Sequence, residues 1–85
     1  MEMICKFVVK DGKVIGESID VFENNLIVKS GSNFIGIPLE SVVEVDKERI
    51  TVKDFDETLA KEVGKRWIVE KSKPVSLEEL EKMGL

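Results

Sequence analysis

Apolar and turn-forming residues alternate in short blocks along the first 53 positions of the chain. The apolar blocks are rich in Val, Ile and Phe, residue types that are enriched in β-strands. Between them stand turn signals, of which Asp11-Gly12 is the strongest because this dipeptide favours a two-residue hairpin. About six short, closely spaced strands favour a small antiparallel barrel over alternating strands and helices. The expected strands are MICKFVV, VIGESIDVF, LIVKS, FIGIP, SVVEV and RITVK.

Alternation within the strands predicts which side chains are buried. In residues 49–53, apolar and polar residues alternate regularly, which predicts a strand with one buried face. In the first strand, Cys5 falls in the same phase as Met3, Phe7 and Val9. We therefore expect Cys5 to be a small buried hydrophobic residue of the core.

Glycine and proline predict where strands bend and end. Gly16 lies inside an apolar run, which indicates a bulge or a tight bend. The stretch FIGIP, residues 34–38, is interpreted as a core strand. In it, Gly36 allows the strand to curve, and Pro38 ends the pairing because proline has no N–H to donate.

The pattern changes at Asp54, and residues 54–67 are expected to form an α-helix. Either Asp54 or Asp56 can cap its first turn, and basic residues gather near its end, as the helix dipole favours. Gly64 lies within this pattern, where it either allows close packing or ends the helix early. The apolar stripe, expected to cover the open end of the barrel, consists of Leu59, Val63 and Trp67.

A second and shorter helix is expected at residues 76–83. Ser76 and Glu79 have the spacing of a capping box, and the apolar residues that follow fall on one face. A helix of about two turns does not persist alone in water, so it must pack on its own barrel or on another chain. The whole chain, residues 1–85, is expected to be a single domain whose barrel spans residues 1–53.

The charge and cysteine content limit which partners and which cellular compartment we expect for this chain. The chain has 85 residues and a net charge of −4, with both signs interspersed, so nucleic acid and anionic membranes are unlikely partners. A single cysteine excludes an intrachain disulfide and fits a reducing cytoplasm. We expect no signal peptide and no membrane span. Abundant Lys and Glu, with no His, Gln or Tyr, is a bias typical of thermophiles.

The residues that usually carry catalysis or bind metals are scarce. The chain has no histidine, so its hydroxyl and thiol groups lack the usual base. Asp54, Asp56 and Glu57 could bind a hard cation, but a calcium loop needs more oxygen ligands and a glycine at a fixed position. Helix capping accounts for these carboxylates without an ion. We therefore expect no enzyme activity, no catalytic residue, no cofactor and no metal site.

Three short motifs follow one another through the middle of the chain. A G-x-x-x-D-V strand contains Gly16, Asp20 and Val21, an I-P-hydrophobic segment occupies residues 37–39, and a hydrophobic-T-V strand occupies residues 50–52. In this order the motifs resemble the PRC-barrel family, and the chain length is similar to that of its small stand-alone archaeal members. The resemblance implies a mainly β fold: a six-stranded antiparallel barrel, here with one or two short C-terminal helices. It also implies a role as a protein-interaction or assembly module.

Surplus apolar residues predict an interaction surface. The strands LIVKS and FIGIP are apolar on both faces, so the face outside the barrel must be covered by the C-terminal helices or by a second subunit. We expect a non-enzymatic, cytoplasmic adaptor that binds a protein partner and forms a two-fold homodimer. The interface candidates are Ile27, Phe34, Ile35, Trp67, Ile68 and Val69.

A ribosome- or RNA-associated factor is the alternative function. Small barrels bind RNA through exposed aromatic residues beside basic ones, and Lys65-Arg66-Trp67 combines the two types. Cations near the end of a helix are also what the helix dipole favours, so this segment has a simpler explanation.

Overall fold

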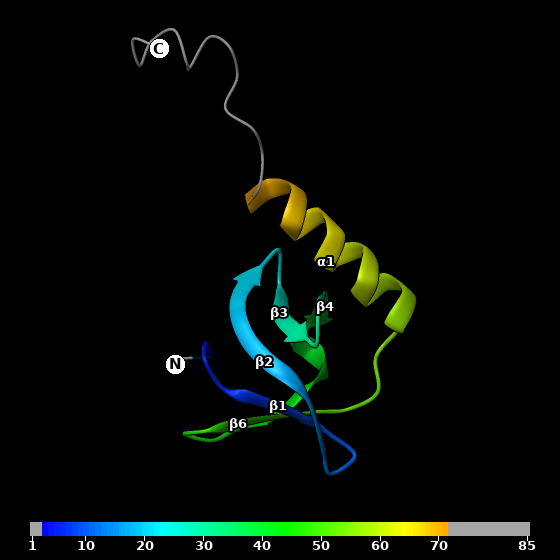
Figure 1. Cartoon of the computed structure of the whole chain (residues 1–85). Helices are drawn as coiled ribbons and strands as arrows, with labels where there is room; N and C mark the ends of the chain where they lie inside the picture. Colours follow the sequence, from blue (N-terminus) through cyan, green and yellow to red (C-terminus); the bar gives the residue numbers. More distant parts are fainter. Residues whose placement is uncertain (1–2, 72–85) are drawn as a thin grey trace, which may run out of the picture.

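The computed structural model describes residues 3–71 as a strongly twisted sheet with one helix packed on it (Figure 1). This confirms the expected mainly β architecture of six strands followed by a helix. The helix expected at residues 76–83 lies outside the described residues. Within residues 3–71 no helix is long and apolar enough to cross a membrane. The elements are β1 (Phe7–Lys10), β2 (Lys13–Phe22), β3 (Asn25–Ser30), β4 (Asn33–Pro38), the 3-10 turn η1 (Leu39–Ser41), β5 (Val42–Val45), β6 (Arg49–Val52) and α1 (Glu57–Lys71).

Tight two-residue turns connect the first four strands. Asp11 and Gly12 both have positive φ angles, 52° and 76°, which is the backbone of a type I′ hairpin. Glu23 and Asn24 repeat this geometry between β2 and β3, with φ angles of 48° and 61°. The third turn places Gly31 at a φ of 62°. The hairpin that Asp11-Gly12 predicts is confirmed.

The sheet has the order β4-β3-β2-β1-β6-β5 and is not closed into a barrel. Within residues 3–71 the edge strands β4 and β5 do not pair, and β1 runs parallel to β6. The expected closed, all-antiparallel barrel is therefore wrong. Pro38 ends β4, and η1 redirects the chain, so that the β5–β6 hairpin reaches the sheet on the far side of β1. The alternation of apolar and polar residues is the same whichever way a strand runs, so it could not predict that β1 and β6 are parallel.

Strand β2 is the longest strand, and it bends between the part that pairs with β1 and the part that pairs with β3. Its first half pairs with β1 and its second half with β3, and each pairing contains a register shift. Ile15 is the unpaired residue of the first shift, between Val14 and Gly16. A Cβ atom at Gly16 would lie only 2.6 Å from Val28 Cγ1 on β3. The expected bulge at Gly16 is confirmed, and Figure 1 shows β2 curving from β1 up towards α1.

The inner face of the bent sheet forms the hydrophobic core. Strand β1 contributes Val8 to this core, and not Phe7 and Val9 as expected from the sequence. Val8 is fully buried, whereas Phe7 is 51% exposed and Cys5 is exposed. Cys5 adopts a left-handed backbone with a φ of 64°, which interrupts the alternation before β1 begins. The prediction of a buried Cys5 is therefore wrong. The buried core residues are Val8, Leu26, Val28, Ile37, Ile50 and Val52.

Helix α1 begins at Glu57 because Asp56 caps it. The Oδ1 atom of Asp56 accepts hydrogen bonds from the N–H groups of Thr58 and Leu59, at 2.9 and 3.1 Å. Of the two candidate caps, Asp56 is thus the one that the structure uses. The helix packs across the outer face of β3 and β4 (Figure 1) rather than over the end of a barrel. Leu59 is 57% exposed, so its predicted place in the apolar stripe is wrong. The residues that face the sheet are Ala60, Val63, Gly64 and Trp67.

Candidate functional site

The outer face of β3 and β4 holds Ile27 and Phe34, two of the six predicted interface residues, and α1 covers both. Ile27 is fully buried. It lies opposite Gly36 in the β3–β4 register, and a Cβ atom at Gly36 would lie 3.4 Å from Ile27 Cδ1 and 2.7 Å from Val63 Cβ. Val63 of α1 therefore occupies the space that Gly36 leaves open. In the described part of the chain, the helix rather than a second subunit buries this apolar face.

Gly64 brings the backbone of α1 onto the backbone of β4. A Cβ atom at this position would overlap the carbonyl group of Phe34 and lie 3.0 Å from the Cα atom of Ile35. Of the two predicted roles for Gly64, close packing is the one observed. The Phe34 ring packs against Trp67, with 5.3 Å between centroids and 38° between planes. Ile35 points to the inner face and packs against the core.

Trp67 is held in place by a carboxylate on β2. Its indole N–H donates to Asp20 Oδ2 at 2.9 Å, while Asp20 Oδ1 accepts from the N–H of Val21 at 2.8 Å. Lys71 adds an ion pair to the same carboxylate at 3.4 Å. The hydrogen bond from Trp67 is the main reason that the pKa of Asp20 lies below its ordinary value, with further contributions from Val21 and Lys71. The contact links the second half of β2 to the last turns of α1.

Acidification is expected to weaken this contact between β2 and α1. The pKa of Asp20 is lower in the folded chain, so the charged carboxylate stabilises the fold at neutral pH. That contribution is lost as the pH falls through the lowered folded-state pKa. The Asp20→Asn variant should therefore show a shallower loss of stability in acid than the wild type, measured as the urea midpoint at successive pH values. Glu62→Gln, on the exposed side of α1, is the matched control and should keep the wild-type slope. An equal slope in Asp20→Asn would contradict the role of this carboxylate.

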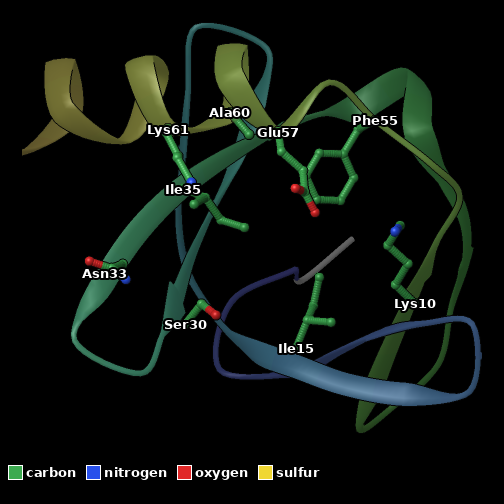
Figure 2. Close-up of a pocket in the computed structure, with 9 residues that line it drawn as sticks. All are labelled: Lys10, Ile15, Ser30, Asn33, Ile35, Phe55, Glu57, Ala60 and Lys61. Carbon is green, nitrogen blue, oxygen red and sulfur yellow. The ribbon is translucent and has the colours of Figure 1, made fainter.

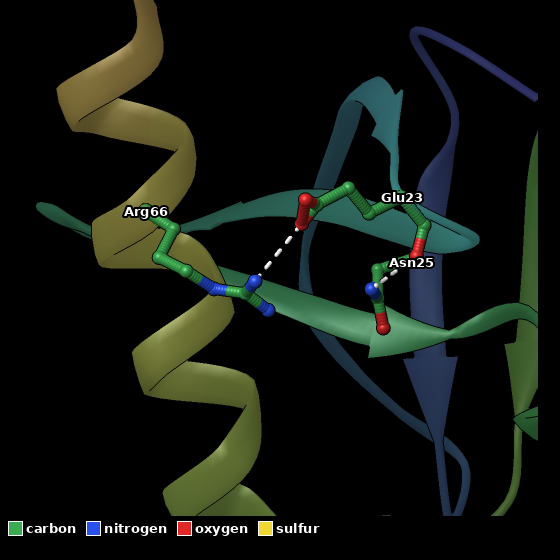
Figure 3. Close-up of polar contacts among 3 residues, drawn as sticks. All are labelled: Glu23, Asn25 and Arg66. Carbon is green, nitrogen blue, oxygen red and sulfur yellow. Dashed lines mark hydrogen bonds and ion pairs between the residues drawn. The ribbon is translucent and has the colours of Figure 1, made fainter.

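An ion pair joins α1 to the β2–β3 turn on the same side of the molecule. Arg66 Nη1 lies 3.0 Å from Glu23 Oε2, and the side-chain amide of Asn25 donates to the Glu23 carbonyl at 2.8 Å (Figure 3). Both charged side chains are largely exposed, so the pair contributes little to stability. Beside it, Ile68 and Val69 remain exposed, Val69 to 65%. Of the six predicted interface residues, these two are the most exposed.

A pocket of about 250 Å³ opens between the start of α1 and the inner face of the sheet (Figure 2). Its apolar floor is formed by Ile15, Ile35, Phe55 and Ala60, with polar groups around the mouth. Lys10 reaches into it, 3.2 Å from Asp54 and 5.7 Å from the centre of the Phe55 ring. Its hydrogen bond to Asp54 is the largest cause of the raised pKa of Lys10. Lys10 is thus held as a cation with its charge already balanced, which makes it neither a base nor a nucleophile at neutral pH.

The outer face of β1, β2 and β6 is the apolar surface that α1 leaves uncovered. Figure 1 shows β1 and β6 at the end of the molecule away from the helix. Phe7 is 51% exposed and Val14, on β2, is 59% exposed. Glu17 and Arg49, also exposed, are the register partners of Phe7 on its two sides. The sequence prediction missed this surface because it placed Phe7 in the core.

Comparison with known proteins gives a family for the chain. The sequence model of a family of unknown function, DUF5749, matches residues 4–81. The chain belongs to the DUF5749 family. The match covers all six strands and α1, so the family shares the segments that build both faces of the sheet. A search of curated proteins finds no match. Nothing in the DUF5749 match links the chain to the PRC-barrel family, so that resemblance stays a prediction.

Proposed function

We propose that this protein is a non-enzymatic interaction module that acts as an adaptor in the cytoplasm and assembles as a homodimer. The observation that carries the proposal is the apolar face around Phe7 and Val14, which no other element within residues 3–71 covers. Large exposed apolar side chains that gather on one face of a sheet are typical of surfaces that bind another protein. The resemblance to PRC-barrel proteins supports the same kind of role.

The polar contacts of the described residues indicate that three aspartates have structural roles. Asp56 caps α1, Asp20 holds Trp67, and Asp54 balances Lys10. Each of these carboxylates has a partner that explains its position without a substrate. Within residues 3–71, no group of three or more His, Cys, Asp or Glu side chains is arranged to hold a metal ion.

The alternative, a ribosome- or RNA-associated factor, gains no support from the segment Lys65-Arg66-Trp67. Trp67 packs on Phe34 and donates its N–H to Asp20, so its ring is not free for a base to stack on. Arg66 pairs with Glu23. The adaptor role therefore remains the better proposal.

Affinity capture from an extract of the source cells tests the adaptor role directly. The purified chain should retain a protein whose binding survives nuclease treatment and is reproduced with both purified proteins in solution. Failure of every retained protein to bind in purified form would refute the adaptor role. Retention of RNA that declines steeply with salt would favour the alternative function instead.

A further inference from the structure

We infer that two copies of this protein stack the outer faces of β1, β2 and β6 on each other, with a two-fold axis that runs parallel to β1 through Phe7. This inference rests on the proposed function and names the surface that forms the homodimer. It differs from the surface expected from the sequence, of which Ile27 and Phe34 are covered by α1 and Ile68 and Val69 lie exposed on α1 itself.

The apolar part of the surface lies on β1 and β2. Phe7 and Val9 both point outward, because the alternate residue Val8 is fully buried in the core. Val14 on β2 and Thr51 on β6 are the register partners of Val9. Phe7, Val9 and Val14 form a short apolar strip with Thr51 at its edge, and Phe7 is its largest side chain.

Opposite charges flank this strip at the level of Phe7. Glu17 lies on one neighbouring strand and Arg49 on the other, each as the direct register partner of Phe7. Both are exposed. The ion pairs found among residues 3–71 involve neither of them. The row Glu17–Phe7–Arg49 therefore presents a negative charge, an aromatic ring and a positive charge in a line across the sheet. The exposed Lys29 on β3 is the other register partner of Glu17 and adds a positive charge beyond it.

This order of charges selects one two-fold arrangement. When the axis runs along β1, rotation exchanges the two sides of the strand, so Glu17 of one copy faces Arg49 of the second copy at both ends. Phe7 then packs on Phe7 of the second copy, Val9 on its Val9, and Val14 on its Thr51. When the axis runs across the strands, Glu17 faces Glu17 and Arg49 faces Arg49, which is repulsive. Both arrangements keep the strands of the two stacked sheets aligned, as face-to-face sheets prefer, so the charges choose between them.

The same pattern favours a second copy over a different protein as the occupant. A closed two-fold dimer needs a patch that is complementary to itself, and the row Glu17–Phe7–Arg49 has this property. A chain of 85 residues also buries a smaller fraction of its surface on folding than a larger domain does, so it gains stability from burying this strip.

Charge reversal tests both the surface and the symmetry. Wild-type protein should form a dimer in sedimentation equilibrium at micromolar concentrations. Glu17→Arg leaves only positive charges beside Phe7, and Arg49→Glu leaves only negative ones, so each variant alone should dimerise about tenfold more weakly. An equimolar mixture of the two variants should recover the dimer as a heterodimer, because the charges are again opposite across the axis. The same reversals on the exposed side of α1, Glu62→Arg and Lys65→Glu, are the matched controls and should leave the dimer unchanged.

Each outcome decides between parts of the inference. Dimerisation that neither single variant weakens would overturn the facing of Glu17 on Arg49, and with it this surface or its axis, while the adaptor role stands on its capture experiment. Dimerisation that both variants weaken and their mixture does not restore would show that residues 17 and 49 do not meet across the dimer, and would overturn this surface. A wild-type chain that stays monomeric throughout would overturn the dimer itself. Circular dichroism of every variant checks that the fold is kept, since all of these positions are exposed.

Discussion

Replacing Gly64 with alanine is expected to destabilise the protein by about 3 kcal/mol, even though alanine is the better helix former. The added Cβ would overlap the carbonyl group of Phe34 and lie 3.0 Å from Ile35 Cα. Both neighbours are backbone atoms of β4, so no side chain can rotate to make room, and α1 must move away from the sheet. On helix propensity alone the same substitution would stabilise the protein by about 1 kcal/mol. The sign of the measured change therefore shows whether helix propensity or the close contact with β4 dominates at position 64.

Urea unfolding followed by circular dichroism measures the effect of Gly64→Ala. The control is Glu62→Ala, two residues earlier on the exposed side of the same helix, where the change should stay within about 0.5 kcal/mol. A Gly64→Ala chain as stable as the wild type, or more stable, would show that α1 does not rest on the backbone of β4.

Replacing Trp67 with alanine is expected to cost about 3 kcal/mol of unfolding free energy, at the lower end of the range for large aromatic residues because Trp67 is half-buried. Three contacts are lost together: the packing on Phe34, the hydrogen bond to Asp20 and the cover of the outer sheet face. Thermal unfolding followed by circular dichroism measures the change. Val69→Ala, two positions further along α1 and 65% exposed, is the control and should unfold close to the wild type. An unchanged Trp67→Ala melting temperature would contradict the role of this residue.

The Trp67→Phe variant separates the ring from the N–H group. Phenylalanine keeps an aromatic ring against Phe34 but cannot donate to Asp20, so the expected cost is about 1 kcal/mol, the usual net value of one hydrogen bond. In an Asp20→Asn background the same change should cost less, because the charged acceptor is already absent. Equal costs in both backgrounds would show that the indole N–H and Asp20 do not act together.

Local signals in the sequence predicted the turns and the strands well. Asp11-Gly12 forms the expected hairpin, because a type I′ turn needs two positive φ angles that few other dipeptides adopt readily. Asp56 caps α1 because its carboxylate reaches N–H groups only two and three residues away. FIGIP forms a strand that ends at Pro38, since the lack of a proline N–H acts at that residue alone. In each case the interacting groups lie close together in the chain.

One unusual backbone conformation and several contacts between distant segments account for the errors and the missed residues. The phase of β1 depends on the left-handed backbone at Cys5, which apolar periodicity does not reveal, so Phe7 was assigned to the core and its surface was missed. Val63 and Trp67 of the predicted helix stripe face the sheet, but Leu59 does not, and Ala60 is buried instead. The close contact of Gly64 with β4 sets this orientation of the helix, and the apolar spacing alone does not reveal it. The bond between Asp20 and Trp67 joins residues that the sequence separates by 47 positions.

The amino-acid sequence by itself determined the six strands, their tight turns, a helix after Asp54 and a single-cysteine, acidic composition. The helix spans Glu57–Lys71 rather than the expected residues 54–67. These features depend on backbone preferences and on hydrogen bonds within a few residues. The tertiary structure alone decided that β1 and β6 run parallel, that the sheet stays open, and which apolar face receives α1. Strand direction and face depend on where distant segments meet, and a pattern of apolar residues is satisfied equally well by several such arrangements.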